Sequence, residues 1–90
     1  MERVHVFIYG LVQGVGYRNY IYNKARLLNI KGWIKNLDDD KVEAVFEGDK
    51  EDISKILDYC IKGHFSAKVK DIKINKENIK NEKEFRILWG

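Results

Sequence analysis

The sequence has few of the features that mark secreted, membrane or multidomain proteins. Its single cysteine, Cys60, cannot form an internal disulfide and is typical of a reducing compartment. No apolar run approaches the roughly 20 residues that a membrane span needs, and Met1-Glu2-Arg3 leads directly into a strand pattern instead of a secretory signal. Low-complexity segments and internal repeats are also absent. We therefore expect a cytoplasmic protein with no membrane partner.

What the sequence does contain is the composition of one small globular domain. Its 90 residues are 44% hydrophobic and 34% charged, so we expect a single domain over residues 1–90. The net charge of +3 is mildly basic, and the lysines near the C-terminus alternate with apolar or acidic residues instead of forming a stripe. These lysines are Lys68, Lys70, Lys73, Lys76, Lys80 and Lys83. The pattern favours a solvated surface, and we predict a monomer without a nucleic-acid partner.

Hydrophobic periodicity predicts the secondary structure. Alternation of apolar and polar residues predicts strands, and apolar residues spaced by three and four predict helices. The strands are expected over 4–9, 31–36, 42–47 and 68–74, and the helices over 17–29 and from an N-cap at Asp49 to a stop at Gly63. The apolar parity changes within 68–74, which predicts a β-bulge. A loop is expected over 75–83, followed by a short final strand over 85–89.

The order of these elements indicates the fold class. Helices with one apolar stripe and strands with one apolar face pack as two layers, with both helices on one side of an antiparallel sheet. The sequence therefore predicts the α+β class, as a ferredoxin-like βαββαβ two-layer sandwich. Because many unrelated functions occur on this fold, the function has to come from a site.

The strongest candidate site is a glycine-rich segment between the first strand and the first helix, Gly10-Leu11-Val12-Gln13-Gly14-Val15-Gly16-Tyr17-Arg18. Glycines let backbone N–H groups approach an anion, the helix N-terminus adds partial positive charge, and Arg18 adds a fork of donors. A Walker A motif is absent, and the dinucleotide fingerprint fails because Asn19 stands where a third glycine is required. A plain tight turn with a solvated Arg18 is the alternative.

Two motifs in this chain resemble the acylphosphatase family. Residues 10–18 are similar to its first signature, Gly-x-Val-Gln-Gly-Val-x-aromatic-Arg. The second signature, Gly-aromatic-small-basic-Asn with a later valine and glycine, is matched by Gly32, Trp33, Lys35, Asn36, Val42 and Gly48. The two motifs have the family's separation, and the likeness extends over nearly all of the chain. The resemblance implies the same sandwich fold that the periodicity predicts.

The resemblance also implies an activity and its residues. The family hydrolyses the carboxyl-phosphate bond of small acyl phosphates to a carboxylate and inorganic phosphate, without a metal or cofactor. Arg18 matches its phosphate-binding arginine, and Asn36 matches the residue that positions the attacking water. The backbone amides that would complete the phosphate site belong to Gln13, Gly14, Val15, Gly16, Tyr17 and Arg18. The catalytic residues implied are thus Arg18 and Asn36, and the chain offers no convincing triad, carboxylate dyad or metal cluster.

A second functional hypothesis belongs to a different class. Acylphosphatase-like domains also occur within larger maturation proteins, so this chain could be a non-catalytic phosphate or carbamoyl-phosphate binding module that acts with a partner protein. RNA binding on the open face of the sheet is a third hypothesis, but the aromatic-rich RNP1 pattern is missing from the central strands.

Some residues depart from the family pattern or attract attention for other reasons. Asp40 occupies the position of a turn glycine in the second signature, and Asp tolerates the left-handed region better than most residues. Ile34 replaces a smaller aliphatic residue, and His64-Phe65 stand where the family often has proline. Three other groups have plainer interpretations: Cys60 as a core residue, His5 and His64 as histidines without a metal, and Asp38, Asp39 and Asp40 as turn formers.

Overall fold

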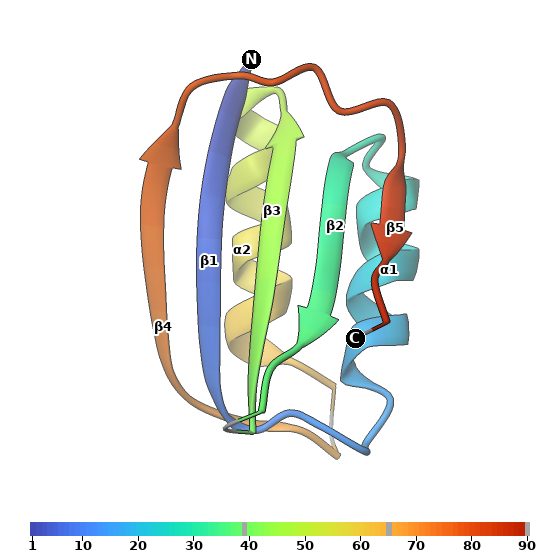
Figure 1. Cartoon of the computed structure of the whole chain (residues 1–90), viewed down its shortest axis with the longest axis vertical. Helices are drawn as coiled ribbons and strands as arrows, with labels where there is room; N and C mark the ends of the chain where they lie inside the picture. The colour runs from blue at the N-terminus through green and yellow to red at the C-terminus, as the bar shows by residue number, and fades with distance from the viewer. Residues whose placement is uncertain (39, 65, 90) are drawn as a thin grey trace.

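Seven helical and strand segments form two layers in the part of the chain that the structure describes (Figure 1). This computed structural model describes residues 1–38, 40–64 and 66–89. In chain order the elements are β1 (Glu2–Leu11), α1 (Tyr17–Leu27), β2 (Lys31–Asn36), β3 (Lys41–Gly48), α2 (Lys50–Lys62), β4 (Lys68–Glu77) and β5 (Phe85–Ile87). The predictions for Asp39 in the β2–β3 turn and for Phe65 after α2 lie outside the described residues.

The strands form one sheet in the order β4-β1-β3-β2-β5, with both helices behind it in the view of Figure 1. The first four strands pair antiparallel, as the sequence predicts. The expectation of a wholly antiparallel sheet is wrong for β5, which pairs parallel to β2 with Ile34 opposite Ile87. The chain leaves β4 and crosses the end of the sheet before β5 begins, so β5 runs in the same direction as β2 (Figure 1). The sheet is therefore mixed.

The edge strand β4 has the bulge that the sequence predicts but is longer than predicted. Tyr9 pairs with Asp71 and Gly10 with Val69, so Lys70 is an extra residue, and the predicted bulge is confirmed. However, β4 continues to Glu77, through residues that the sequence predicts as loop. These last residues are exposed at the sheet edge and carry no apolar side chain, so hydrophobic alternation gives no signal there.

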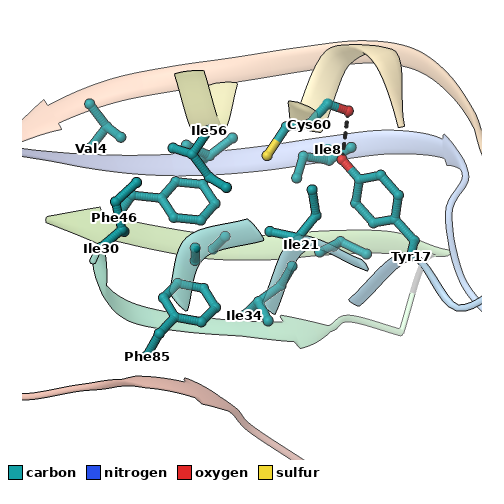
Figure 2. Packing of buried hydrophobic residues seen from close by; sticks show 14 of the residues in the cluster. Val4, Ile8, Tyr17, Ile21, Ile30, Ile34, Phe46, Ile56, Cys60 and Phe85 are labelled. Atoms are coloured by element: carbon teal, nitrogen blue, oxygen red, sulfur yellow. Dashed lines mark hydrogen bonds between the residues drawn. The ribbon is translucent and has the colours of Figure 1, made fainter. Parts of the chain in front are cut away.

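The core lies between the sheet and the two helices (Figure 2). Its helix-facing sheet residues alternate as predicted: Val6, Ile8, Ile34 and Phe46 have no exposed surface. The helices contribute Ile21, Ala25, Ile53, Ile56 and Cys60, which confirms Cys60 as a core residue.

The end of α1 differs slightly from the sequence prediction, whereas both ends of α2 agree with it. α1 ends at Leu27, two residues early, because Asn29 turns into the left-handed region with a φ of 56°. At the start of α2, Asp49 occupies the predicted N-cap position. Its side chain makes no capping hydrogen bond within the described part of the chain.

A buried ion cluster closes the end of the sheet where the chain crosses from β4 to β5. Arg3 is 4% exposed and Glu47 is fully buried, and Arg3 Nη1 donates to Glu47 Oε2 at 2.8 Å. Arg3 also donates to Glu82 and Glu77, each at 2.9 Å. The backbone amides of Lys80 and Glu82 donate to the Glu47 carboxylate at 2.7 and 2.9 Å. Glu47 therefore holds the crossing segment against the sheet.

Removing the charge of Glu47 should destabilise the fold strongly. The substitution Glu47→Gln removes the fully buried charge beside Arg3 and turns an amide donor toward the backbone N–H groups of Lys80 and Glu82. Breaking a buried pair in this way costs about 3 kcal/mol or more. We expect that loss in the free energy of unfolding measured with urea. The matched control is Glu43→Gln, because Glu43 pairs with the half-buried His5, where a partly exposed pair contributes about 1 kcal/mol or less. Equal losses in the two variants would contradict this role of Glu47.

The same carboxylate should make stability depend on acid pH. Burial acts to raise the pKa of Glu47, but hydrogen bonds from the Lys80 amide, Arg3 and the Glu82 amide outweigh it and hold the pKa below its ordinary value of 4.5. A lowered folded-state pKa gives stability that is present above the unfolded pKa and lost as pH falls through the folded pKa. We expect wild-type stability to fall between about pH 5 and pH 2 and the Glu47→Gln curve to be flatter there.

Candidate functional site

Three connections gather at the end of the sheet opposite the ion cluster, the lower end in Figure 1. They join β1 to α1, β2 to β3, and α2 to β4. The first connection contains the glycine-rich segment, and the second follows Asn36, the last residue of β2. The fold thus brings the two sequence signatures to the same end of the molecule.

The backbone of the glycine-rich connection has two glycines in the left-handed region and open space beside one of them. Gly14 and Gly16 have φ values of 71° and 79°, a region that side chains disfavour. A Cβ added at Gly14 would meet nothing within 4 Å, so the space beside this backbone is open. Gly16 is the N-cap of α1, and this helix has no acidic residue in its first turn and no side-chain cap among the described residues. Its first N–H groups and its dipole therefore favour a negative charge here.

A cavity of about 130 Å³ lies between this connection, the first turn of α1 and the end of β5. Its lining residues are Val12, Gly14, Gly16, Tyr17, Arg18, Asn19, Ile87 and Trp89. Four of the six predicted phosphate-site residues are among them. Sequence reasoning missed Ile87 and Trp89 as site residues, because the parallel pairing that places β5 beside β2 has no signal in the periodicity. It also missed Asn19, which follows Arg18 in the first turn of α1.

A larger cavity of about 300 Å³ lies at the other end of α1, and it fits the predicted chemistry less well. It is lined by Arg26, Lys31 and Glu84 among others, but it contains no glycine. A helix C-terminus presents carbonyl oxygens, which disfavour an anion. We therefore take the smaller cavity as the candidate site.

Arg18 is the cationic side chain of the smaller cavity. It lies in the first turn of α1 and is half-buried. Its guanidinium carbon is 4.5 Å from the centre of a Trp89 ring, a distance typical of a cation–π contact. Stacking on an aromatic face leaves the in-plane N–H donors of a guanidinium available for a phosphate or carboxylate.

Two residues of the connection use their side chains to anchor it. Tyr17 is 1% exposed, and its hydroxyl donates to the Cys60 carbonyl oxygen at 2.6 Å (Figure 2). Val15 packs against the same core. The side chains of Tyr17 and Val15 therefore serve to anchor this segment to the core. Burial raises the pKa of the Cys60 thiol to about 12, which leaves it protonated and unsuited to act as a nucleophile.

Gln13 joins the glycine-rich connection to the hairpin that carries Asn36. Its side-chain amide donates to the carbonyl oxygens of Leu37 at 2.7 Å and Lys41 at 3.0 Å. The Leu37 amide donates to the same Lys41 oxygen at 2.8 Å, which closes the turn. In this turn Asp40 has a φ of 58° and is exposed, so an aspartate does occupy the left-handed turn position.

Asn36 lies outside the cavity lining but has an unused acceptor. The Asn36 Oδ1 atom is buried and makes no hydrogen bond to any residue that the structure describes. Burying such an atom without a partner is costly, and a bound water or ligand is the usual remedy. The candidate site thus has two parts, the cavity beside the glycine-rich connection and the buried Oδ1 atom of Asn36. The Gln13 side chain links the glycine-rich connection to the hairpin that carries Asn36.

Two other kinds of functional feature, a metal site and a membrane-spanning helix, are not found among the described residues. No group of three or more histidine, cysteine, aspartate and glutamate side chains among them could hold a metal ion. None of their helices is long and apolar enough to cross a membrane. His5 contacts Glu43 at 2.6 Å and Glu77 at 3.2 Å on the sheet face that the helices leave uncovered.

Comparisons with known proteins agree on one family. The family model for acylphosphatase matches residues 4–87. The acylphosphatase of Chloroflexus aurantiacus is 42% identical over 90 residues, which cover 99% of this chain and 98% of that protein. The crystal structure of acylphosphatase from Bacillus subtilis superposes with a TM-score of 0.95 at 29% identity, covering 99% of this chain and 100% of the other.

A longer protein contains a similar region. Full-length HypF, in a phosphate- and nucleotide-bound form, matches with a TM-score of 0.84 at 26% identity. The match covers 98% of this chain but only 12% of HypF. Because the family model and the full-length relatives agree over nearly the whole sequence, the chain belongs to the acylphosphatase family of enzymes.

Proposed function

We propose that this enzyme hydrolyses the carboxyl-phosphate bond of small acyl phosphates in the cavity beside Arg18. The observation that carries the proposal is that Arg18, Gly14 and Gly16 line one small cavity at a helix N-terminus without a side-chain cap from the described residues. An arginine fork and the first N–H groups of a helix suit the three non-bridging oxygens of a phosphoryl group. Inorganic phosphate, as a product, would occupy the same position.

The proposed role of the loop is electrostatic. Phosphoryl transfer spreads charge over the non-bridging oxygens, and donors that are already in place stabilise this charge without reorganising. Tyr17 and Val15 anchor the loop to the core, so its N–H groups are held before a substrate arrives. Arg18 supplies the formal positive charge, and its contact with Trp89 restricts its orientation.

The proposed role of Asn36 is to position the attacking water. An amide has no useful pKa and cannot act as a base, but its buried Oδ1 can accept a hydrogen bond from water. The water oxygen attacks phosphorus in line, and the bond from phosphorus to the acyl oxygen breaks. The carboxylate leaves with that electron pair, and the water proton passes to the phosphate oxygens. Because a carboxylate is a good leaving group, the step needs little acid catalysis.

A binding module is the second candidate, and the similarity to phosphate-bound HypF is the observation that favours it. Under this alternative the same cavity would hold phosphate or carbamoyl phosphate without turnover, for a partner protein. Two measurements distinguish the candidates: isothermal titration with inorganic phosphate, and an ultraviolet assay of benzoyl phosphate hydrolysis. Phosphate binding without hydrolysis would favour the module.

Replacing Arg18 should abolish most activity. We expect Arg18→Ala and Arg18→Lys each to lower kcat/KM for benzoyl phosphate by about 10² to 10³, the usual effect of losing one transition-state donor. Lysine should not rescue, since a point charge replaces a bidentate fork. The matched control is Arg26→Lys, an exposed arginine later in the same helix. An unchanged phosphate inhibition constant in Arg18→Lys would refute the fork argument.

Replacing Asn36 should affect turnover more than binding. We expect Asn36→Ala to lower kcat by about 10², because a misplaced nucleophile loses the advantage of alignment. The phosphate inhibition constant should stay near the wild-type value, since Asn36 does not line the cavity. Asn23→Ala, an exposed site on α1, is the control. Full activity in Asn36→Ala would rule out the proposed water-positioning role.

Breaking the Gln13 link should separate the two parts of the site. The variant Gln13→Leu removes both hydrogen bonds to the hairpin, which should cost about 1 kcal/mol of unfolding free energy. We expect kcat to fall by about tenfold, because small misplacements of positioning groups are expensive. The phosphate inhibition constant should change little, since the loop amides remain. A fall in phosphate affinity as large as the fall in kcat would show that Gln13 acts on the loop itself.

A further inference from the structure

The candidate cavity is small, and one of its lining side chains, Trp89, extends from it into solvent. Its volume is about 130 Å³, whereas pockets that enclose drug-sized ligands measure about 300 Å³ or more. With the phosphoryl group beside Arg18 and the glycines, the acyl group lies toward the remaining lining residues and the rim of the cavity.

The rim contains one large apolar surface, the indole of Trp89. This side chain lines the cavity, yet it is 76% exposed. One part of it faces the Arg18 guanidinium at 4.5 Å, so most of the ring remains accessible. The other apolar lining residues, Val12 and Ile87, are buried or half-buried and offer less surface.

The fold holds Trp89 at this position. Ile87 pairs with Ile34 in the parallel β2–β5 ladder, and the Leu88 amide donates to the Ile34 carbonyl oxygen at 2.8 Å. The backbone is therefore tied to β2 up to the residue before Trp89. A ring that is already ordered loses less entropy when a ligand packs on it.

We propose that Trp89 is the acyl-group wall of the site and makes the enzyme prefer acyl phosphates with a flat, apolar acyl group. This inference rests on the proposed function, because it assumes that the phosphoryl group lies beside Arg18. A flat aromatic acyl group can stack offset on the indole, an arrangement that adds to the burial of apolar area. A short aliphatic group covers little of the ring and gains correspondingly less. Trp89 takes part in no bond-making step, so it is a specificity-determining residue.

An alternative role for Trp89 makes a different prediction. If the ring only orients Arg18, its loss weakens phosphoryl binding for every substrate by the same factor. If the ring contacts the acyl group, its loss affects aromatic substrates selectively. The ratio of kcat/KM values for two substrates therefore separates the two roles.

The kinetic test compares benzoyl phosphate with acetyl phosphate in wild type, Trp89→Leu and Trp89→Phe. We expect Trp89→Leu to reduce the benzoyl-to-acetyl ratio of kcat/KM by about fivefold, the usual scale of one aromatic stacking contact. Trp89→Phe should recover part of the ratio. The matched control is Trp33→Leu, because Trp33 lies on the other face of the sheet, near His5. Equal losses for both substrates, or no loss for either, would overturn the proposal.

A binding test does not depend on turnover. In Trp33→Phe the sole tryptophan is Trp89, so its fluorescence reports events at the rim. We expect benzoylphosphonate, a non-hydrolysable analogue, to bind more tightly than acetylphosphonate and to quench this fluorescence. The preference should disappear in Trp89→Leu, measured by isothermal titration. Preferential binding without hydrolysis of either acyl phosphate would sink the proposed function and leave the wall intact. Hydrolysis with no Trp89-dependent preference would support the proposed function and overturn the proposed role of Trp89.

Discussion

The buried pair of Arg3 and Glu47 determines where the C-terminal part of the chain lies. The Glu47 carboxylate accepts hydrogen bonds from two backbone amides of the crossing segment, so it fixes a stretch that has almost no apolar residues of its own. From there the Gly32 amide donates to the Glu84 carbonyl oxygen at 2.9 Å, and β5 begins beside β2. The parallel ladder then carries Trp89 to Arg18. The ion cluster at one end of the sheet thus helps to position Trp89 at the opposite end, because the short strand β5 connects the two.

The glycine-rich connection illustrates how a loop is made rigid without secondary structure of its own. Tyr17 is tied to the backbone of α2, Gln13 to the β2–β3 hairpin, and Val15 to the core. The anchors reach α2, the β2–β3 hairpin and the core, so the residues on both sides of Gly14 and Gly16 are held in place. In the proposed mechanism this matters because fixed donors lower the barrier only if they need not move when charge develops. Flexible residues therefore occur inside a rigid frame.

The sequence predicts those features whose signal is local. Alternation at Val4, Val6 and Ile8 gives the first strand, and the change of apolar parity between Val69 and Ile72 gives the β4 bulge. The glycines give the turn before α1, with positive φ at Gly14 and Gly16, whereas the anion site expected there stays a prediction. The sequence does not predict the direction of β5, because Phe85, Arg86 and Ile87 alternate identically in a parallel and an antiparallel pair. Strand alternation also gives no sign that the crossing segment buries Glu47 completely. The contact between Arg18 and Trp89 joins residues more than 70 positions apart and depends on both of these missed features.

Two reactive side chains, Cys60 and His5, are engaged elsewhere in this fold, so the proposed catalysis depends on how the site groups are positioned. Cys60 is buried as a thiol of raised pKa, and His5 is engaged by Glu43 and Glu77 on the uncovered sheet face. An acyl phosphate suits such a site, since its carboxylate leaves without needing a strong acid and water can lose its proton to the phosphate. The proposed catalysis then consists of a clamp at Arg18, an amide at Asn36 and the distance between them. The Gln13 side chain joins the loop to the hairpin and helps to set that distance, so an amide that takes no part in the chemistry still contributes to the site.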